Sequence, residues 1–243
     1  MENRMKKEEM KIEKKEQYGW QDFKKIVQIL RSDEGCPWDR VQTHESLRPY
    51  VLEEAAEVVA GVRILRETGD AENLCEELGD LLLQVFLHSE IAEEAQEFTL
   101  DEVVDGVAKK MIRRHPHVFG EKEKEQVYES WEKIKKREKE NKEWAKKPLR
   151  DIPMELGALT RAQKVQKKAE NLYGKKTTFD KSIEIMEKSI AQIKQNTSEK
   201  NGEVDKNAIA QIFWENVNLA RILQIHAEQA LNDEIDTIID QYE

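Results

Sequence analysis

The chain has 243 residues, enough for one large or two small domains with a sizeable core. Charged residues make up 37% of it and it has only ten glycines and five prolines, a composition that favours a mostly helical protein. The formal net charge of −10 argues against a general affinity for the nucleic acid backbone, so we expect no nucleic-acid partner.

The two cysteines and the N-terminus bear on where the protein works. Cys36 and Cys75 have no metal-like spacing and give no disulfide framework, which favours a reducing, intracellular setting. The N-terminal stretch is too charged for a signal peptide, and the longest apolar run, LLLQVFL, is far shorter than a membrane span. We therefore expect a cytoplasmic protein with no membrane partner.

Apolar residues at helical spacing predict a series of helices along the chain. Residues 1–17 form a charged extension to which we assign no function. Pro49 suits the first turn of the second helix, and Thr99, with Glu102 three residues later, has the spacing of a capping box. The predicted helical segments are residues 21–31, a segment from Pro49 that carries LEEAAEVVAG, 74–95, 98–114, 125–144, 154–171, 179–196 and 207–243.

These segments group into two units. The first covers residues 18–145, a linker follows at 146–153, and the second unit covers 154–243. In each unit an acid-bearing helix is followed by a connector and then an apolar helix, which indicates a weak internal repeat.

Two acidic motifs stand out in the first unit. LEEAAEVVAG carries Glu53, Glu54 and Glu57, and EELGDLLLQV carries Glu77 and Asp80. Residues three and four apart share a helix face, so each motif projects its acids together. The simplest interpretation is a solvated helix face, because charge runs usually lie exposed. The alternative is that the acids face inward and hold a cation.

The second motif favours a metal site. Apolar residues from Leu74 to Phe86 wrap most of its helix, so we expect that helix to be largely buried, with Gly79 allowing close approach of another helix or a ligand. Clustered carboxylates repel one another and stay ionised together only with cations. Oxygen ligands without His or Cys favour Mg²⁺ or Mn²⁺, and Mg²⁺ commonly borrows further oxygens from a substrate phosphate.

With GCPWDRVQTHESLRPYVLEEAAE, EELGDLLLQV, RRHPHVFG and SWEKIK in order, the sequence resembles the MazG nucleoside triphosphate pyrophosphohydrolases over roughly residues 20–243. The resemblance implies an all-α, helix-bundle fold that is usually dimeric. It implies hydrolysis of NTPs or dNTPs to the monophosphate and pyrophosphate, with Mg²⁺ as cofactor and Mn²⁺ as a substitute.

The resemblance also assigns residues. Glu54, Glu57, Glu77 and Asp80 match the family's metal ligands. Glu53 matches the first acid of the motif, and we take it as the candidate catalytic residue that orients or deprotonates the attacking water.

Basic and aromatic residues match positions that contact the nucleotide in the family. Lys110 and Arg114 lie four apart on one helix and match phosphate-contacting residues, although a basic helix end also suits the helix dipole. Trp131 and Lys135, again four apart, match residues near the nucleotide, although Trp131 could equally anchor its helix to the core.

The second unit departs from the motif. Ile183, Glu184 and Glu187 fall where the EExxE acids belong, and Ala208 and Gln211 replace the acids of ExxD. This half is expected to be a degenerate copy kept for packing or dimer formation.

Two other functions compete with this one. A non-enzymatic helical interaction protein would need no convergence of the acids, and the charged composition supports it. The same site could also act on a nucleotide alarmone.

Overall fold

The structure, a computed structural model, describes residues 12–120, 134, 137–138, 147–198 and 206–242. Every secondary-structure element among the described residues is a helix, which confirms the predicted all-α class. The helices are α2 (Trp20–Arg31), α3 (Pro37–Arg40), α4 (His44–Thr68), α5 (Glu72–Glu94), α6 (Leu100–Arg114), α7 (Pro116–Phe119), α9 (Ala158–Tyr173), α10 (Phe179–Ser198), α11 (Lys206–Ile222) and α12 (Ala227–Asp240). Among the described residues, no helix is both long and apolar enough to cross a membrane.

The chain divides into two compact units, Met1–Trp131 and Glu132–Glu243, which we call unit 1 and unit 2. The predicted boundaries, with a linker at residues 146–153, stay a prediction. The helix predicted over residues 125–144 lies mostly outside the described residues.

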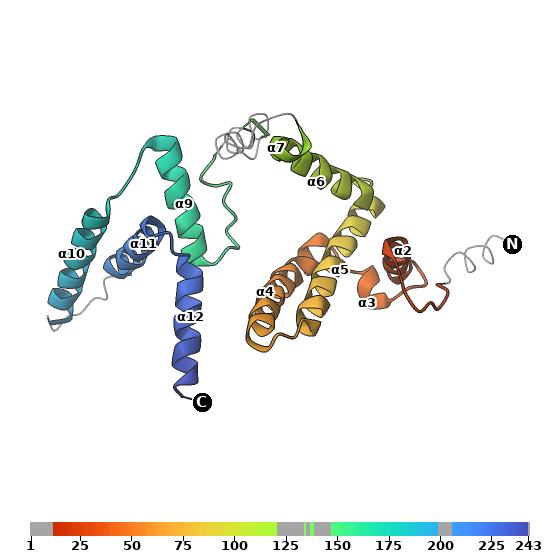
Figure 1. The fold of residues 1–243 in the computed structure, drawn as a ribbon, viewed down its shortest axis with the longest axis horizontal. Helices are drawn as coiled ribbons and strands as arrows, with labels where there is room; N and C mark the ends of the chain where they lie inside the picture. The colour runs from red at the N-terminus through yellow and green to blue at the C-terminus, as the bar shows by residue number, and fades with distance from the viewer. Residues whose placement is uncertain (1–11, 121–133, 135–136, 139–146, 199–205, 243) are drawn as a thin grey trace. The chain divides into compact units, whose positions relative to one another are not determined.

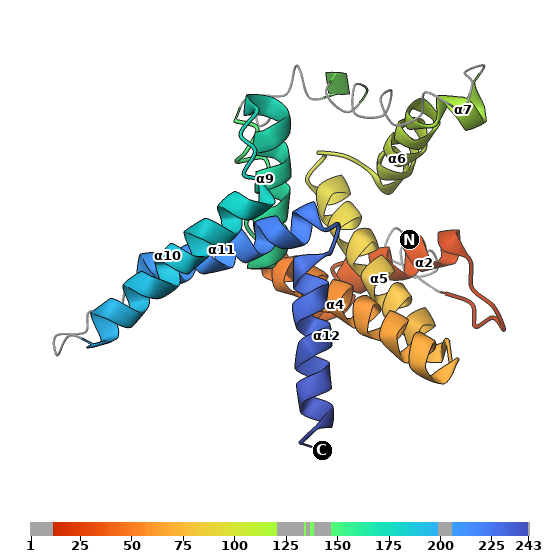
Figure 2. The same ribbon diagram turned by 60° about the vertical axis from the view of Figure 1, so that its left-hand side comes forward.

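The centre of unit 1 is the helical hairpin formed by α4 and α5, which lie side by side in Figures 1 and 2. A three-residue turn joins them, and Gly69 begins it with a φ of 76°, a conformation that favours glycine. Gly61 lets the two helices approach closely, because a Cβ there would lie 3.0 Å from the Cα of Leu74. A Cβ at Gly79 would meet nothing within 4 Å, so no other described helix approaches it, and the close approach of a ligand there stays a prediction.

Helix α4 begins earlier than predicted. Thr43 caps it by accepting a hydrogen bond from the Ser46 amide, and the Ser46 hydroxyl accepts one from the Thr43 amide. Pro49 therefore lies inside the helix rather than in its first turn. The reciprocal cap offsets the hydrogen bond that a proline cannot donate.

The core of unit 1 gathers at one end of the hairpin. Val27 of α2 packs with Leu47, Phe86 and Leu87, and the Phe23 and Phe86 rings lie 4.7 Å apart. Arg31, only 7% exposed, fastens this end, since its guanidinium donates to both carboxylate oxygens of Glu94. The same side chain donates to the carbonyl of Asp39 in α3, a short helix that lies between the first two predicted helical segments.

The other half of the hairpin is less covered than predicted. Leu78 is 50% exposed and no residue from 72 to 83 is buried, so the expectation that α5 is largely buried is wrong for its first half. Among the described residues, no other element covers the exposed apolar side chains of α5, such as Leu78.

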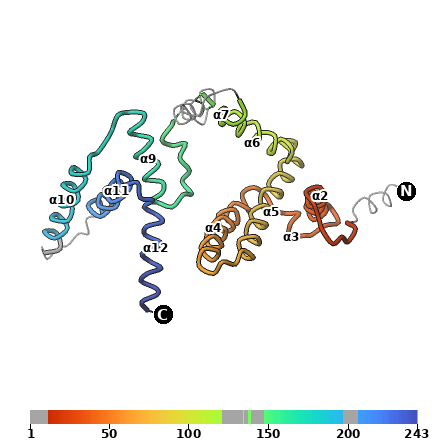
Figure 3. Tube along the Cα trace, in the orientation of Figure 1, coloured from red at the N-terminus to blue at the C-terminus, as the bar shows by residue number. Residues whose placement is uncertain are grey.

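Unit 2 is a second group of helices. Helices α10 and α11 lie side by side, and α9 packs against α11 and α12, as the trace in Figure 3 shows. The helix predicted over residues 207–243 is interrupted after Ile222, where Gln224 has a φ of 61° and the Ile225 amide bonds to the Ala220 carbonyl. His226 then caps α12.

Candidate metal site

Three of the predicted ligands converge on the open half of the α4–α5 hairpin. Glu54 and Glu57 extend from α4 and Glu77 from α5, and each offers a carboxylate oxygen within 4.8 Å of the others. The hairpin turn reverses the chain, so acids that share a face on each helix meet across the helix interface. We call these three residues the acidic cluster.

The other two predicted acids, Asp80 and Glu53, are not among the three that converge. Asp80 is half-buried, and its negative charge acts on Glu54. Glu53 is exposed and is not among the three converging acids. Its assignment as the catalytic residue stays a prediction.

The cluster carries unfavourable electrostatics. Burial raises the pKa of the Glu54 carboxyl above its ordinary value, and the charges of Asp80 and Glu57 raise that pKa further. Within the described part of the chain, no lysine or arginine forms a salt bridge with Glu54, Glu57, Glu77 or Asp80. The described residues therefore provide no ion pair that relieves the repulsion among these acids.

Two amide side chains form hydrogen bonds with acids of the cluster, and neither was predicted from the sequence. The side-chain amide of Asn73 donates to the Glu77 carboxylate over 2.8 Å, and an amide hydrogen bond from Gln84 lowers the pKa of Glu54. Gln84 could have been found by spacing, because it lies four residues after Asp80 and seven after Glu77, on the same face of α5. An uncharged amide in a run of leucines gives no other signal.

The donor set suits a hard divalent cation. It consists of carboxylate oxygens, with no His or Cys in the group, and Mg²⁺ and Mn²⁺ prefer such ligands. The convergence also separates the competing hypotheses, since an interaction protein has no need to bring these acids together. A fully solvated face is a poorer description too, because Glu54, Glu77 and Asp80 are each half-buried.

The structure describes two of the four predicted substrate-binding residues. Lys110 and Arg114 lie on α6, which leads away from the α4–α5 hairpin in Figures 1 and 2, and both are half-buried. Trp131 and Lys135 lie outside the described residues.

The matching positions in unit 2 form no such cluster. Glu184 accepts hydrogen bonds from the ammonium groups of Lys181 and Lys188, and these lower its pKa to about 2. Ala208 is buried, and Gln211 is exposed. The lysines of α10 already neutralise Glu184.

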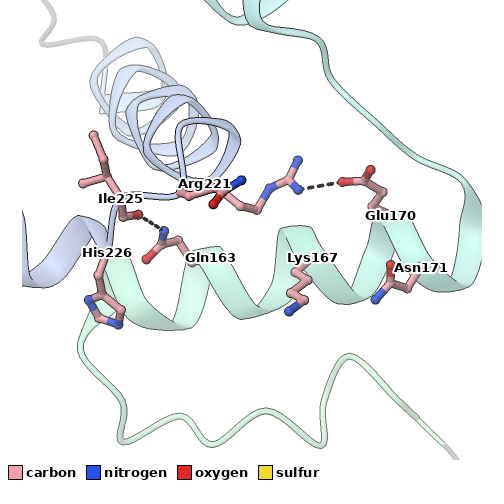
Figure 4. A pocket seen from close by; sticks show the side chains of 8 residues that line it. Gln163, Lys167, Glu170, Asn171, Arg221, Ile225 and His226 are labelled. Atoms are coloured by element: carbon pink, nitrogen blue, oxygen red, sulfur yellow. Dashed lines mark hydrogen bonds and ion pairs between the residues drawn. The ribbon is translucent and has the colours of Figure 1, made fainter. Parts of the chain in front are cut away.

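Unit 2 also contains an open groove of about 450 Å³, shown in Figure 4. Its polar groups serve the fold. Arg221 forms an ion pair of 2.6 Å with Glu170, and Gln163 donates to the Ile225 carbonyl over 2.7 Å. Gln163 also accepts from the Ala227 amide, so these side chains hold the α11–α12 turn against α9.

Comparison with known proteins gives consistent matches. The family model of the MazG nucleotide pyrophosphohydrolase domain matches residues 42–119, which include the acidic cluster, Asp80 and Gln84. The nucleoside triphosphate pyrophosphohydrolase/pyrophosphatase MazG of Thermotoga maritima is 34% identical over 225 residues, covering 92% of this chain and 84% of that protein. The nucleoside triphosphate pyrophosphohydrolase of Escherichia coli K12 is 37% identical over 214 residues, covering 85% and 79%. The YabN protein of Bacillus subtilis is 42% identical over 161 residues, and the match spans only 32% of its length.

Proposed function

This chain belongs to the MazG nucleotide pyrophosphohydrolase family, and from that premise we propose that unit 1 hydrolyses nucleoside triphosphates to the monophosphate and pyrophosphate. The observation that carries the proposal is the convergence of Glu54, Glu57 and Glu77 within 4.8 Å, without a salt bridge to any of the three among the described residues.

The acids have different roles in this proposal. Glu54, Glu57, Glu77 and Asp80 hold the ion, for which Mg²⁺ is the natural occupant and Mn²⁺ a substitute. When bound, the ion supplies charge stabilisation to the pyrophosphate that leaves. Glu53, exposed beside the cluster, orients or deprotonates the water that attacks the α-phosphorus.

The nucleotide is held by residues outside the cluster. Lys110 and Arg114 on α6 contact its phosphates, and Trp131 and Lys135 lie near the nucleotide. The family resemblance supports these four assignments.

The active form is a homodimer. On α4 the side chains of Leu52, Val59 and Val62 are each at least half exposed, and Leu78 and Val85 continue the apolar surface on α5. Several exposed apolar side chains on one hairpin are typical of an interaction site, and a second copy of the chain is the occupant that the family favours. The free thiols of Cys36 and Cys75 support a reducing, cytoplasmic setting.

The activity can be tested with a panel of NTPs and dNTPs in the presence of Mg²⁺. Pyrophosphate is expected as the first phosphorus product, together with the nucleoside monophosphate, and excess chelator should stop the reaction. Early release of orthophosphate with a nucleoside diphosphate would contradict the proposed bond cleavage. Full turnover in chelator would contradict the metal site.

A further inference from the structure

The side chain of Gln84 in α5 is an anomaly that packing does not explain. It is 6% exposed, and its carbonyl oxygen Oε1 is buried with no hydrogen-bond partner among the described residues. A buried acceptor without a partner costs about 1–3 kcal/mol, so such groups are rare in stable folds. Apolar side chains of similar length would fill this position without that penalty.

The position of the amide shows where this oxygen points. The nitrogen end of the amide interacts with the Glu54 carboxylate, which can only accept hydrogen bonds. Both amide atoms are bonded to one carbon atom, and Gln84 lies four residues after Asp80, so the amide that carries Oε1 shares the face of α5 with the acids. The opposite orientation of the amide would place two acceptors against each other.

We propose that Gln84 is a positioning residue of the metal site: its amide nitrogen orients Glu54, and its carbonyl oxygen accepts a hydrogen bond from water held by the bound cation. The inference rests on the proposed function only in taking the acidic cluster as a cation site. Mg²⁺ keeps several waters when proteins bind it, and these waters are donors that the buried oxygen lacks. Outer partners of this kind fix the orientation of metal ligands.

Unit 2 supplies the contrast. The internal repeat aligns Asp80 with Gln211, so the residue four further on, Gln84, aligns with Glu215. Glu215 is 3% exposed, and the Ser182 hydroxyl donates to it over 2.6 Å. Where the metal ligands are missing, the corresponding buried oxygen thus has a partner within the protein. Where the acids are present, the buried oxygen of Gln84 has no partner among the described residues.

The test measures Mn²⁺ binding to the full chain without nucleotide, by calorimetry or by the electron paramagnetic resonance of free Mn²⁺. Gln84→Met keeps the length of the side chain and removes both polar atoms. Its Mn²⁺ affinity is expected to fall about 10-fold, while its melting temperature without metal holds or rises. Ser89→Ala is the matched control, because Ser89 is also buried on α5 but donates to the Val85 carbonyl. Its Mn²⁺ affinity is expected to stay unchanged.

A second variant covers the case in which Gln84→Met does not fold. Gln84→Glu keeps an acceptor oxygen and adds a negative charge, so Mn²⁺ should raise its melting temperature by more than it raises that of the wild type. An equal or smaller rise would overturn the proposal.

Other outcomes separate this inference from the proposed activity. Wild-type Mn²⁺ affinity in Gln84→Met would overturn it, as would a wild-type chain that binds no Mn²⁺. If the chain binds Mn²⁺ through Glu54 but hydrolyses no nucleotide, the proposed activity fails, and the affinity of Gln84→Met still decides the role of Gln84.

Discussion

The α4–α5 hairpin of unit 1 and the α10–α11 pair of unit 2 treat their carboxylates in opposite ways. In unit 1, Glu54 has a raised pKa and the described residues provide no salt bridge for it. In unit 2, two lysines on the same helix lower the pKa of Glu184 to about 2. Both are glutamates on the first helix of a pair, so the motif alone does not decide which of them is poised for a metal.

The difference shows what marks a functional acid in a chain this rich in charge. An acid whose neighbours are lysines at helical spacing belongs to a solvated helix face. An acid that is half-buried against other acids raises the free energy of the empty protein, and a bound cation lowers it again. Four predictions compare unit 1 with unit 2, from the largest expected effect to the smallest.

The largest effect concerns which unit works. Glu54→Gln with Glu57→Gln should lower turnover by at least about 100-fold, because both changes remove metal ligands. Glu184→Gln with Glu187→Gln makes the matched change in unit 2 and should leave turnover nearly unchanged. Steady-state pyrophosphate release measures both. Loss of activity in the unit 2 variant, with folding and oligomeric state intact, would place catalysis in the other half.

The next effect concerns the arginine that fastens each unit. Arg31→Ala should lower the free energy of unfolding by about 3 kcal/mol, because it leaves the carbonyl of Asp39 and the carboxylate of Glu94 without their donor. Arg221→Ala removes the ion pair with Glu170 and should cost less, because the Arg221 side chain is 17% exposed and that of Arg31 only 4%. Urea denaturation of both variants gives the comparison. A larger loss of unfolding free energy in Arg221→Ala than in Arg31→Ala would contradict the prediction.

A smaller effect is pH dependence specific to unit 1. Burial lowers the pKa of His88 below 6.5, and His44, whose ring nitrogen lies 2.7 Å away, lowers it further. The unfolded chain therefore binds the proton more readily, and stability should fall as the pH drops through 6.5 towards the lowered pKa. His88→Leu copies Leu219, which the repeat aligns with it, and should weaken this dependence. Unfolding free energies measured well above and well below pH 6.5 provide the check; an unchanged pH slope in the variant would count against it.

The smallest effect concerns Glu184 itself. In Lys188→Met the carboxyl loses one of its two partners, so its pKa should rise from about 2 towards 4.5. The pair is exposed, so global stability should hardly change and the shift should shrink in high salt. Carboxyl NMR titration follows it directly. A pKa that stays near 2 in the variant would show that Lys188 is not a cause.

Much of the fold follows from spacing alone. The Thr99–Glu102 capping box forms as predicted, and α2 and α10 begin within a residue of their predicted starts. The break after Ile222 was missed because it contains no glycine or proline. There a glutamine takes up the left-handed conformation, which glutamine rarely adopts and its sequence does not announce.

The candidate site was likewise predictable only in part. The acids of EExxE and ExxD were predictable because helical spacing fixes which side chains share a face. The short hairpin turn then brings three of them together. The place of Gln84 beside the acids also follows from spacing. Which amide atoms of Asn73 and Gln84 find a partner does not, because that is set by packing between helices rather than by spacing along one.

The three-residue turn between α4 and α5 also bears on how the site comes into being. All of the proposed metal ligands lie between Glu54 and Asp80, on two helices that are consecutive in the chain. Bringing them together closes only a short loop, for which the entropic penalty is small, and local contacts of this kind form early in folding. The ligand set is therefore assembled as soon as one hairpin folds, without waiting for unit 2 or for the packing of α2. A hairpin that carries a complete ligand set is also a unit that a gene can copy whole, and a copy can lose its acids without losing its shape.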